Sequence, residues 1–291
     1  MYCFSYLSIK FLCLFGLFLL RILAQKVPYD VNYNIIYGNE HIVSFNNGRE
    51  LQISMDKSSG SGFGSKVNYG SGFFHMKIKL PNRDSAGVVI AFYLHSNNKN
   101  HDEVDIEFLG NREGKPYNLQ TNVFANGEGN REQRMHLWFD PTADFHNYKI
   151  LWNDHQIVFF VDNIPIRVFK NYTNIGVDYP HQPMQVLATI WDGDSWATDG
   201  GYSKINWSFA PFKAHFQDFN IGGCPIIIES INSHNNCNSQ SNYWWNQRKY
   251  WNLSSKQRRL YGEYKAKYIT YDYCEDKSRF PNPPLECVTQ I

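Results

Sequence analysis

Three carboxylates stand at every second position within residues 101–110, whose sequence is HDEVDIEFLG. A helix would bring Glu103 and Glu107 together but would turn Asp105 away from them. Alternation with β-branched and aromatic residues, ended by a glycine, favours a β-strand instead. On a strand the three acids share one face with His101, and the apolar residues between them line the other face.

The repulsion expected among Glu103, Asp105 and Glu107, the carboxylate row, indicates a functional site. A solvated strand face usually mixes charge signs, because like charges side by side repel. Three acids with no base among them are costly, and perturbed carboxylates cluster at functional sites. They cannot all ionise easily, so one should hold a proton near neutral pH. The row therefore offers a nucleophile and a proton donor on one strand.

The spacing of Glu103 and Glu107 is compatible with cleavage of a glycosidic bond. Four residues apart on a strand, their Cα atoms lie roughly 13 Å from each other. Retaining glycosidases need two carboxyl groups about 5–5.5 Å apart, and inverting ones about 6.5–9.5 Å. Two glutamate side chains that lean together can reach the shorter distance, so the spacing permits the retaining mechanism without establishing it.

Residues 101–111 resemble the signature of the xyloglucan endotransglucosylase/hydrolases, a plant branch of glycoside hydrolase family 16. Three further blocks agree with this family, and the likeness covers nearly everything after the first few tens of residues. The blocks are Leu119–Phe124, Leu137–Thr142, and Tyr271–Cys274 followed by Arg279–Pro281. The resemblance implies that Glu103 is the nucleophile, Glu107 the general acid/base and Asp105 a helper between them, with no cofactor.

The resemblance also implies a retaining, endo-acting enzyme of the plant cell wall. It would cut the β-1,4-glucan backbone of xyloglucan and transfer the new end to another xyloglucan chain. Hydrolysis is the close alternative, but dedicated hydrolases of the family tend to have a longer loop than residues 125–132, so transfer is favoured. A glycan-binding module can share such a fold. A structural wall protein without an active site is a third alternative. Both alternatives leave the three acids unexplained.

Short alternating runs separated by Gly, Pro, Asn and Asp extend from about Val31 to Asn220 and predict an antiparallel β-sandwich. The resemblance implies a concanavalin-like jelly roll whose curved sheet forms a glycan cleft, and we assign residues 25–220 to it. Residues 221–291 would form the family's C-terminal extension on the acceptor side of the cleft. There we expect a short helix capped by Ser254 or Ser255 and a strand at 268–273.

The first 24 residues contain an apolar run that is about half as long as the ~20 residues of a membrane span. We predict a secretory signal cleaved near Ala24. Cleavage would change the formal charge from 28 basic and 27 acidic residues to 26 and 27, so neither nucleic acid nor an anionic membrane is an expected partner. We expect a monomer, secreted to the cell wall and apoplast, that acts on polysaccharide donors and acceptors.

Four cysteines remain after the predicted signal, namely Cys224, Cys237, Cys274 and Cys287. An even number in a secreted chain predicts disulfides, and four cysteines allow three connectivities. The resemblance favours Cys224 with Cys237 and Cys274 with Cys287. A zinc site is the alternative, but the Cys-x-x-Cys spacing typical of such sites is missing.

Aromatic side chains can stack on the C–H faces of neutral sugars. Our candidates are Tyr93, Trp191 and Trp196, although either tryptophan could simply be part of the core. The resemblance adds Ser195 and Gly200, which fall where glucan-binding residues of the family are expected.

Neutral polar side chains extend this candidate surface, because amides and hydroxyls pair with sugar hydroxyls. The candidates on one predicted strand are Gln120, Thr121 and Asn122. The turn residues Asn130, Arg131 and Glu132 resemble a substrate-binding segment of the family, with a solvated hairpin as the alternative. By the same resemblance, Tyr271 and Arg279 would contact the acceptor glycan.

His101 could join Glu103 and Asp105 as metal ligands, since two-residue spacing on a strand puts ligands on one face. The family uses no catalytic metal, so we expect none, and we assign His101 to positioning or to a sugar contact.

Three sequons predict N-glycosylation, at Asn171, Asn206 and Asn252. Many family members carry a sequon directly after the catalytic strand, whereas here Asn111 begins a segment that is not one.

Overall fold

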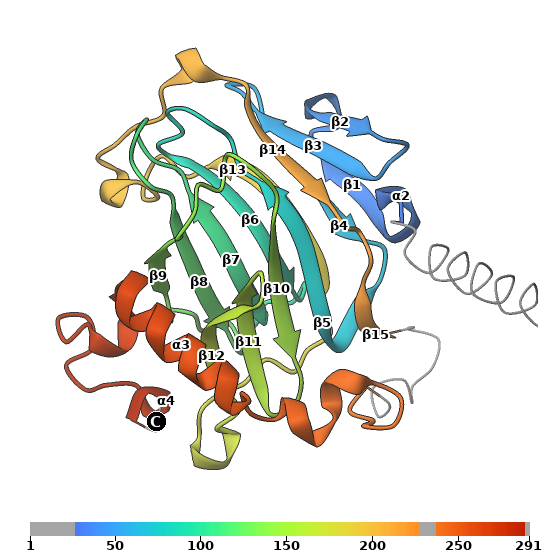
Figure 1. Cartoon of the computed structure of the whole chain (residues 1–291), viewed down its shortest axis with the longest axis vertical. Coiled ribbons are helices and arrows are strands. Elements are labelled where there is room, and N and C mark those ends of the chain that lie inside the picture. The colour runs from blue at the N-terminus through green and yellow to red at the C-terminus, as the bar shows by residue number, and fades with distance from the viewer. Residues whose placement is uncertain (1–26, 227–236, 289–291) are drawn as a thin grey trace, which may run out of the picture.

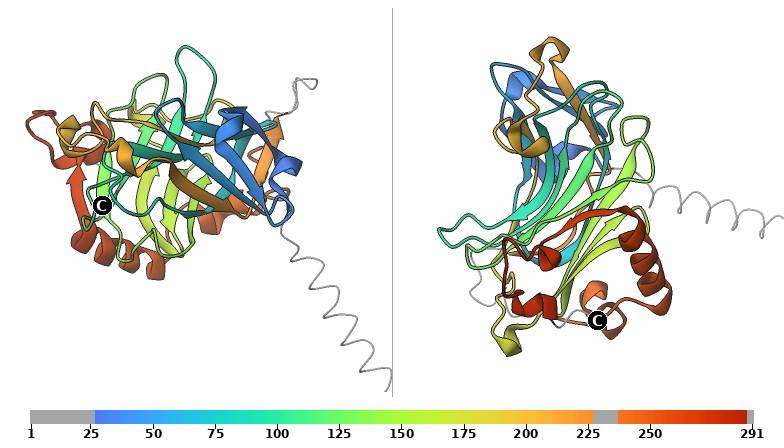
Figure 2. Two further views of the ribbon diagram at one scale, coloured as in Figure 1. Left: turned by 90° about the horizontal axis from the view of Figure 1, so that it is seen from above. Right: turned by 90° about the vertical axis from the view of Figure 1, so that its left-hand side faces the viewer.

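The computed structural model describes residues 27–226 and 237–288, so the predicted signal segment lies outside the described residues. These residues form two antiparallel sheets that pack face to face, with curved and twisted strands (Figures 1 and 2). The prediction of an all-β sandwich is therefore confirmed. Within the described ranges, no helix has the length and apolar character that a membrane crossing requires.

The first sheet carries the motif strand in its middle. Its eight strands are, in spatial order, β1 (Tyr33–Tyr37), β4 (Ser61–Ser65), β13 (Gln185–Asp192), β6 (Val88–His95), β7 (Glu103–Leu109), β8 (Asn118–Phe124), β9 (Gln133–His136) and β16 (Ile269–Asp272). Because β7 has a paired strand on either side, its backbone is fixed by hydrogen bonds to both β6 and β8.

The second sheet covers one face of the first. Its strands are, in order, β12 (Ile164–Lys170), β11 (Gln156–Val161), β10 (His146–Trp152), β5 (Asn68–Lys79), β14 (Phe212–Gln217), β3 (Glu50–Met55) and β2 (Ile42–Phe45), and β15 (Gly222–Ile226) also pairs with β5.

The core between the sheets fixes which way β7 faces. Val104, Ile106 and Phe108 are fully buried in it, and the Phe108 ring packs edge-on against Tyr148 of β10 at 4.6 Å between centroids. Full burial of such a side chain is worth about 1.5–3 kcal/mol. The alternate residues of β7 consequently point out of the sandwich, as the sequence predicts.

The C-terminal segment extends the first sheet through β16, which pairs with β9, and places α3 (Ser255–Tyr268) along β12 (Figure 1). Ser254 caps this helix and Gln257 completes a capping box, as the prediction of a cap at Ser254 or Ser255 anticipated. Two short helices, α2 (Tyr29–Asn32) and α4 (Leu285–Val288), lie near the ends of the described chain. The Cys224–Cys237 and Cys274–Cys287 disulfides are both present, which confirms the predicted pairing.

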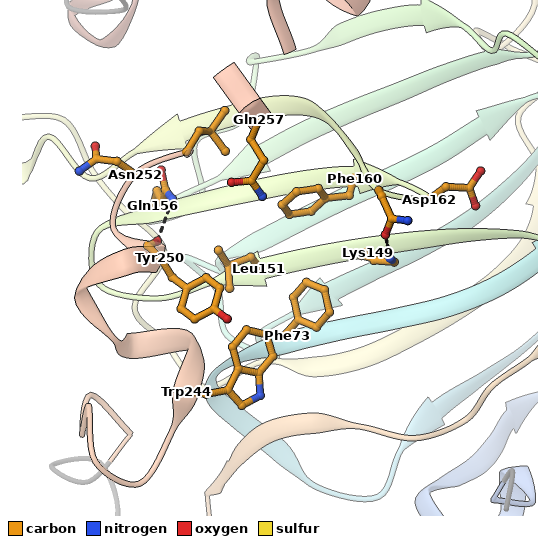
Figure 3. Close-up of a pocket in the computed structure, with 12 residues that line it drawn as sticks. Phe73, Lys149, Leu151, Gln156, Phe160, Asp162, Trp244, Tyr250, Asn252 and Gln257 are labelled. Atoms are coloured by element: carbon orange, nitrogen blue, oxygen red, sulfur yellow. Dashed lines mark hydrogen bonds between the residues drawn. The ribbon is translucent and has the colours of Figure 1, made fainter. Parts of the chain in front are cut away.

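A second cluster of apolar side chains joins the C-terminal segment to the outer face of the second sheet. Between them lies a pocket of about 270 Å³ whose aromatic walls are Phe73, Phe160, Trp244 and Tyr250 (Figure 3). Gln156 donates a hydrogen bond across it to the carbonyl of Tyr250 at 2.8 Å. The carboxylate row lies on the other outer face of the sandwich.

Candidate active site

The three acids of β7 face neighbours that the sheet register brings beside them. Glu107 lies opposite Gln120 on β8, Asp105 lies between Tyr93 and Asn122, and Glu103 lies between His95 and Phe124. Side chains alternate between the two faces along each strand, and residues that are directly opposite on paired strands point to the same face. Tyr93, Gln120 and Asn122 of the predicted sugar-binding set therefore adjoin the carboxylates.

Glu107 is held by two successive hydrogen bonds through the side-chain amide of Gln120, which we call the amide relay. Gln120 donates a hydrogen bond from Nε2 to Oε2 of Glu107 at 2.7 Å, and its Oε1 accepts one from Nε of Arg134 at 2.7 Å. Burial and, to a smaller extent, the charge of Glu103 raise the pKa of Glu107, the Gln120 hydrogen bond and the charge of Arg134 oppose the rise, and the resulting pKa is about 7. A carboxyl group with this pKa can give up and take back a proton near neutral pH.

Asp105 sits in the middle of the row and is almost fully buried. Burial raises its pKa well above the usual value, and the charges of Glu103 and Glu107 and a hydrogen bond with Glu103 act in the same direction. A protonated Asp105 can donate that hydrogen bond to the Glu103 carboxylate. The middle acid would then orient Glu103 and reduce the repulsion within the row.

Two residues that the sequence did not single out support the row electrostatically. Arg167 of β12 is buried beneath the sheet, donating from one terminal nitrogen to the carbonyl and hydroxyl oxygens of Thr121 at 2.7 and 3.0 Å, and its charge lowers the pKa of Asp105. Arg134 of β9 acts on Glu107 from the outer face. An arginine inside an otherwise apolar strand, Ile-Pro-Ile-Arg-Val-Phe, is a signal that could have pointed to Arg167.

The structure does not bring Thr121 into the sugar-facing group. The strand alternation turns its side chain into the sandwich, where its hydroxyl contacts Arg167. Its polar neighbours Gln120 and Asn122 point to the opposite face.

His101 lies at the Glu103 end of the row. Its Nε2 is 3.9 Å from Oε2 of Glu103, and its ring packs against Phe124 with centroids 5.2 Å apart. His95 approaches the same carboxylate oxygen at 3.5 Å. No signal in the sequence could have found His95, because its position depends on the register between β6 and β7.

The fourth acid of the motif, Asp102, has a different place. It is fully buried, and its carboxylate accepts hydrogen bonds from the backbone N–H groups of Asn126, His181 and Gln182, each at 2.8 Å. Asp102 thereby ties the start of β7 to the β8–β9 turn and to the segment before β13.

The two predicted tryptophans lie at the Glu107 end of the row. Trp191 of β13 and Trp196 have ring centroids 5.9 Å apart and pack partly buried against Val89, Leu109 and Ala197. Ser195 and Gly200 are exposed in the loop that follows β13. Gly200 has a φ of 65° and open space where a Cβ would stand.

The β8–β9 turn and the C-terminal segment form one polar cluster. Arg279 donates to Glu132 at 2.7 Å, to Asn130 at 2.6 Å and to the Tyr271 hydroxyl at 3.3 Å. Tyr271 pairs with Arg134 across β16 and β9, so this cluster continues from the amide relay on Glu107.

Arg131 is placed differently from the other turn residues. Its largely buried guanidinium forms an ion pair with Glu286 at 2.8 Å and donates to the carbonyls of Val123 and Glu128. Its side chain therefore anchors the turn to α4 and does not join the polar cluster around Arg279.

Comparison with known proteins extends these observations. Residues 29–209 match the family described as Glycosyl hydrolases family 16, and residues 239–287 match the xyloglucan endo-transglycosylase C-terminus. The chain is 55% identical to xyloglucan endotransglucosylase/hydrolase protein 2 of Arabidopsis thaliana, over 98% of this chain and 97% of that protein. It is 50% identical to a xyloglucan endotransglucosylase/hydrolase of Brassica oleracea var. botrytis, over 91% and 88%.

Solved structures share the fold at lower identity. A Bacillus licheniformis beta-glucanase superposes with a TM-score of 0.53 at 23% identity, over 64% of this chain and 89% of that one. The Crh5 transglycosylase superposes with a TM-score of 0.52 at 21% identity, over 65% and 79%. These likenesses show the fold, and the sequence matches establish that the chain belongs to glycosyl hydrolases family 16, and within it to the xyloglucan endotransglucosylase/hydrolases.

Proposed function

We propose that the protein is a retaining, endo-acting transglycosylase that cuts the β-1,4-glucan backbone of xyloglucan and joins the new end to another xyloglucan chain. The observation that carries this proposal is the carboxylate row of β7, in which burial and mutual repulsion raise the pKa values of Asp105 and Glu107. A site with one protonated acid and one nucleophilic carboxylate suits double displacement at a sugar carbon.

In the first half of the reaction Glu107, as its acid form, protonates the departing sugar oxygen while Glu103 attacks the anomeric carbon. The glycosidic bond breaks as an ester bond to Glu103 forms, which gives a covalent glycosyl-enzyme. Asp105 orients Glu103 by hydrogen bonding. In the second half Glu107, now ionised, takes the proton of an incoming sugar hydroxyl, which displaces Glu103 and restores the free enzyme.

The sugar contacts would continue along the same face. Tyr93, Trp191 and Trp196 offer rings for stacking, and Gln120 and Asn122 offer amides. Of the other expected contacts, Ser195 and Gly200 lie in the exposed loop after β13, and His101 lies beside Glu103. We propose that all of these residues contact the glucan along a cleft over the first sheet.

The acceptor is proposed to bind over β9 and β16. The cluster of Asn130, Glu132, Tyr271 and Arg279 lies there, on the side of Glu107 from which a sugar hydroxyl would arrive. Transfer is favoured over hydrolysis by the tight β8–β9 connection, in which Ala125 and Glu128 pair around the turn. A short connection leaves this side of the site open to a second polysaccharide.

We further propose that residues 1–24 are a secretory signal, that residues 25–220 and 221–291 are the catalytic unit and its extension, and that the mature enzyme is a monomer of the cell wall and apoplast. Two disulfides suit an oxidising compartment. Of the three sequon asparagines proposed as glycosylated, Asn206 and Asn252 are exposed and Asn171 is half-buried.

The test incubates the purified enzyme with xyloglucan, with and without a labelled xyloglucan oligosaccharide, while polymer size and label incorporation are followed together. Label entering large polymer supports transfer. Falling polymer size with the label left behind would mean that water is the acceptor and that the enzyme is an endo-β-1,4-glucanase. Glu103→Gln should abolish both reactions while the circular dichroism spectrum stays that of the folded enzyme, and retained turnover in this folded variant would exclude Glu103 as nucleophile.

A further inference from the structure

Two imidazoles and one carboxylate converge at the Glu103 end of the row. Nε2 of His95 lies 3.5 Å and Nε2 of His101 lies 3.9 Å from the same oxygen, Oε2 of Glu103. The ligand atoms of the three residues all lie within 4.8 Å of one another. All three side chains are between one fifth and one third exposed, so an ion from solution can reach them.

These separations are longer than a direct hydrogen bond, which is about 2.7–3.2 Å between heavy atoms. They are close to the spacing of ligands around a tetrahedral metal. With metal–ligand distances of about 2.0–2.2 Å, neighbouring ligand atoms of a tetrahedral zinc ion stand about 3.4 Å apart. Small rotations of the two histidine side chains would bring all three atoms to this spacing.

The surroundings hold the ligands near this geometry. The His101 ring packs between its neighbours, with centroids 5.1 Å from His95 and 5.2 Å from Phe124. Glu103 and His95 are directly opposite each other in the β6–β7 ladder, so their backbones cannot move apart without breaking the sheet. A hydrogen bond with Asp105 further restricts the Glu103 carboxyl group.

We propose that His95, His101 and Glu103 form a binding site for zinc or a similar divalent transition metal, and that the bound ion inhibits the enzyme. Two imidazoles and one carboxylate with an open fourth position are a ligand set that zinc accepts, and imidazole ligands disfavour magnesium and calcium. The ion would coordinate the Glu103 carboxylate, so the oxygen lone pair that attacks the sugar would no longer be free to react. This inhibitory effect rests on the proposed role of Glu103, whereas binding itself does not.

The binding test uses the full secreted chain without a histidine tag, stripped with EDTA and dialysed. Calorimetric titration with zinc chloride should show one site per chain, and cobalt(II) should give visible absorption bands of a low-coordinate site. His95→Ser should weaken zinc binding at least about tenfold, since even partners outside the ligand shell change affinity about 10–100-fold. His95→Gln is a second variant if His95→Ser unfolds.

The matched control is His181→Ser, because the His181 side chain is 78% exposed and is not one of the three ligands. It should bind zinc as the unmodified enzyme does, and magnesium chloride should give no binding heat at this site. Equal zinc affinity in the folded His95 variants and the unmodified enzyme would overturn the site.

The effect on catalysis is measured separately as inhibition of transfer by zinc, with each variant compared with its own metal-free rate. Zinc should inhibit the unmodified enzyme and the His181 variant, EDTA should restore both, and His95→Ser should need at least about tenfold more zinc for half inhibition. Binding that depends on His95 but leaves turnover unchanged would overturn the inhibition and the role of Glu103, while the metal site would stand. Loss of the site with normal turnover would leave the proposed function intact.

Discussion

The amide relay on Glu107 makes a prediction about the pH dependence of catalysis. Glu107 must be protonated to act as an acid, so kcat/KM should fall as pH rises through its pKa of about 7. Gln120 donates to the ionised form of Glu107 and thereby lowers this pKa. Gln120→Met removes the donor at similar volume, so the basic limb of the pH profile should move to higher pH.

The size of the movement follows from the hydrogen bond that is lost. A hydrogen bond to a charged group is worth about 1.5–3 kcal/mol, and one pKa unit corresponds to 1.36 kcal/mol. The midpoint of the basic limb should therefore move to higher pH by about 1–2 units. At pH 8 only about a tenth of the unmodified enzyme would be protonated at Glu107, against half or more of the variant. Relative to its own plateau, the variant should be about five- to tenfold more active than the unmodified enzyme at pH 8.

The assay measures kcat/KM for xyloglucan between pH 4 and pH 9 in buffers of constant ionic strength. Asn122→Ala is the matched control, since Asn122 lies on the same face but its oxygen accepts hydrogen bonds from the backbone of Val123 and Arg131. It should lower activity without moving the limb. A limb in Gln120→Met that stays in place or moves to lower pH would refute the assignment of Glu107 and Gln120.

Three other predictions concern stability and the acceptor. Because the folded pKa of Glu107 is raised from 4.5 to about 7, the folded state binds more protons in this window, so the unfolding free energy falls as pH rises from 4.5 to 7. Glu107→Gln should remove about 3 kcal/mol of that fall in denaturant titrations at pH 4 and pH 8, and parallel pH dependence in both proteins would contradict the shift. Arg279→Ala should raise the acceptor KM about tenfold with donor cleavage kept, and an unchanged acceptor KM would remove Arg279 from the acceptor site. Glu286→Ala removes the carboxylate partner of the largely buried Arg131 and should lower the unfolding free energy by about 3–5 kcal/mol in urea titration, whereas a loss below 1 kcal/mol would show that water replaces the carboxylate.

Local patterns in the sequence were enough to predict the elements that carry the site. The alternation in β7 predicts both its strand conformation and its outward acids, because side chains alternate strictly along a strand. The pair Ser254 and Ser255 predicts the helix start, since a serine can satisfy its free N–H groups, and the structure shows that Ser254 is the cap.

Contacts between strands that are distant in sequence could not be predicted in this way. His95 meets Glu103 only through the β6–β7 register, and Arg167 reaches Thr121 across the sandwich from another sheet. The likeness to the family places Arg131 among substrate residues, whereas packing of the C-terminal segment pairs its guanidinium with Glu286. These positions are set by tertiary packing, which leaves no local signature in the chain.

The central claim is that the glycosyl group is carried by Glu103, and trapping the intermediate tests it most directly. Glu107→Gln cannot supply acid or base, so a xyloglucan oligosaccharide with an activated leaving group should glycosylate the enzyme faster than the ester is released. Mass spectrometry of the digested protein should find one added oligosaccharide on the peptide that contains Glu103, at that residue. An adduct at another residue, or steady release of inverted product without any adduct, would contradict the account.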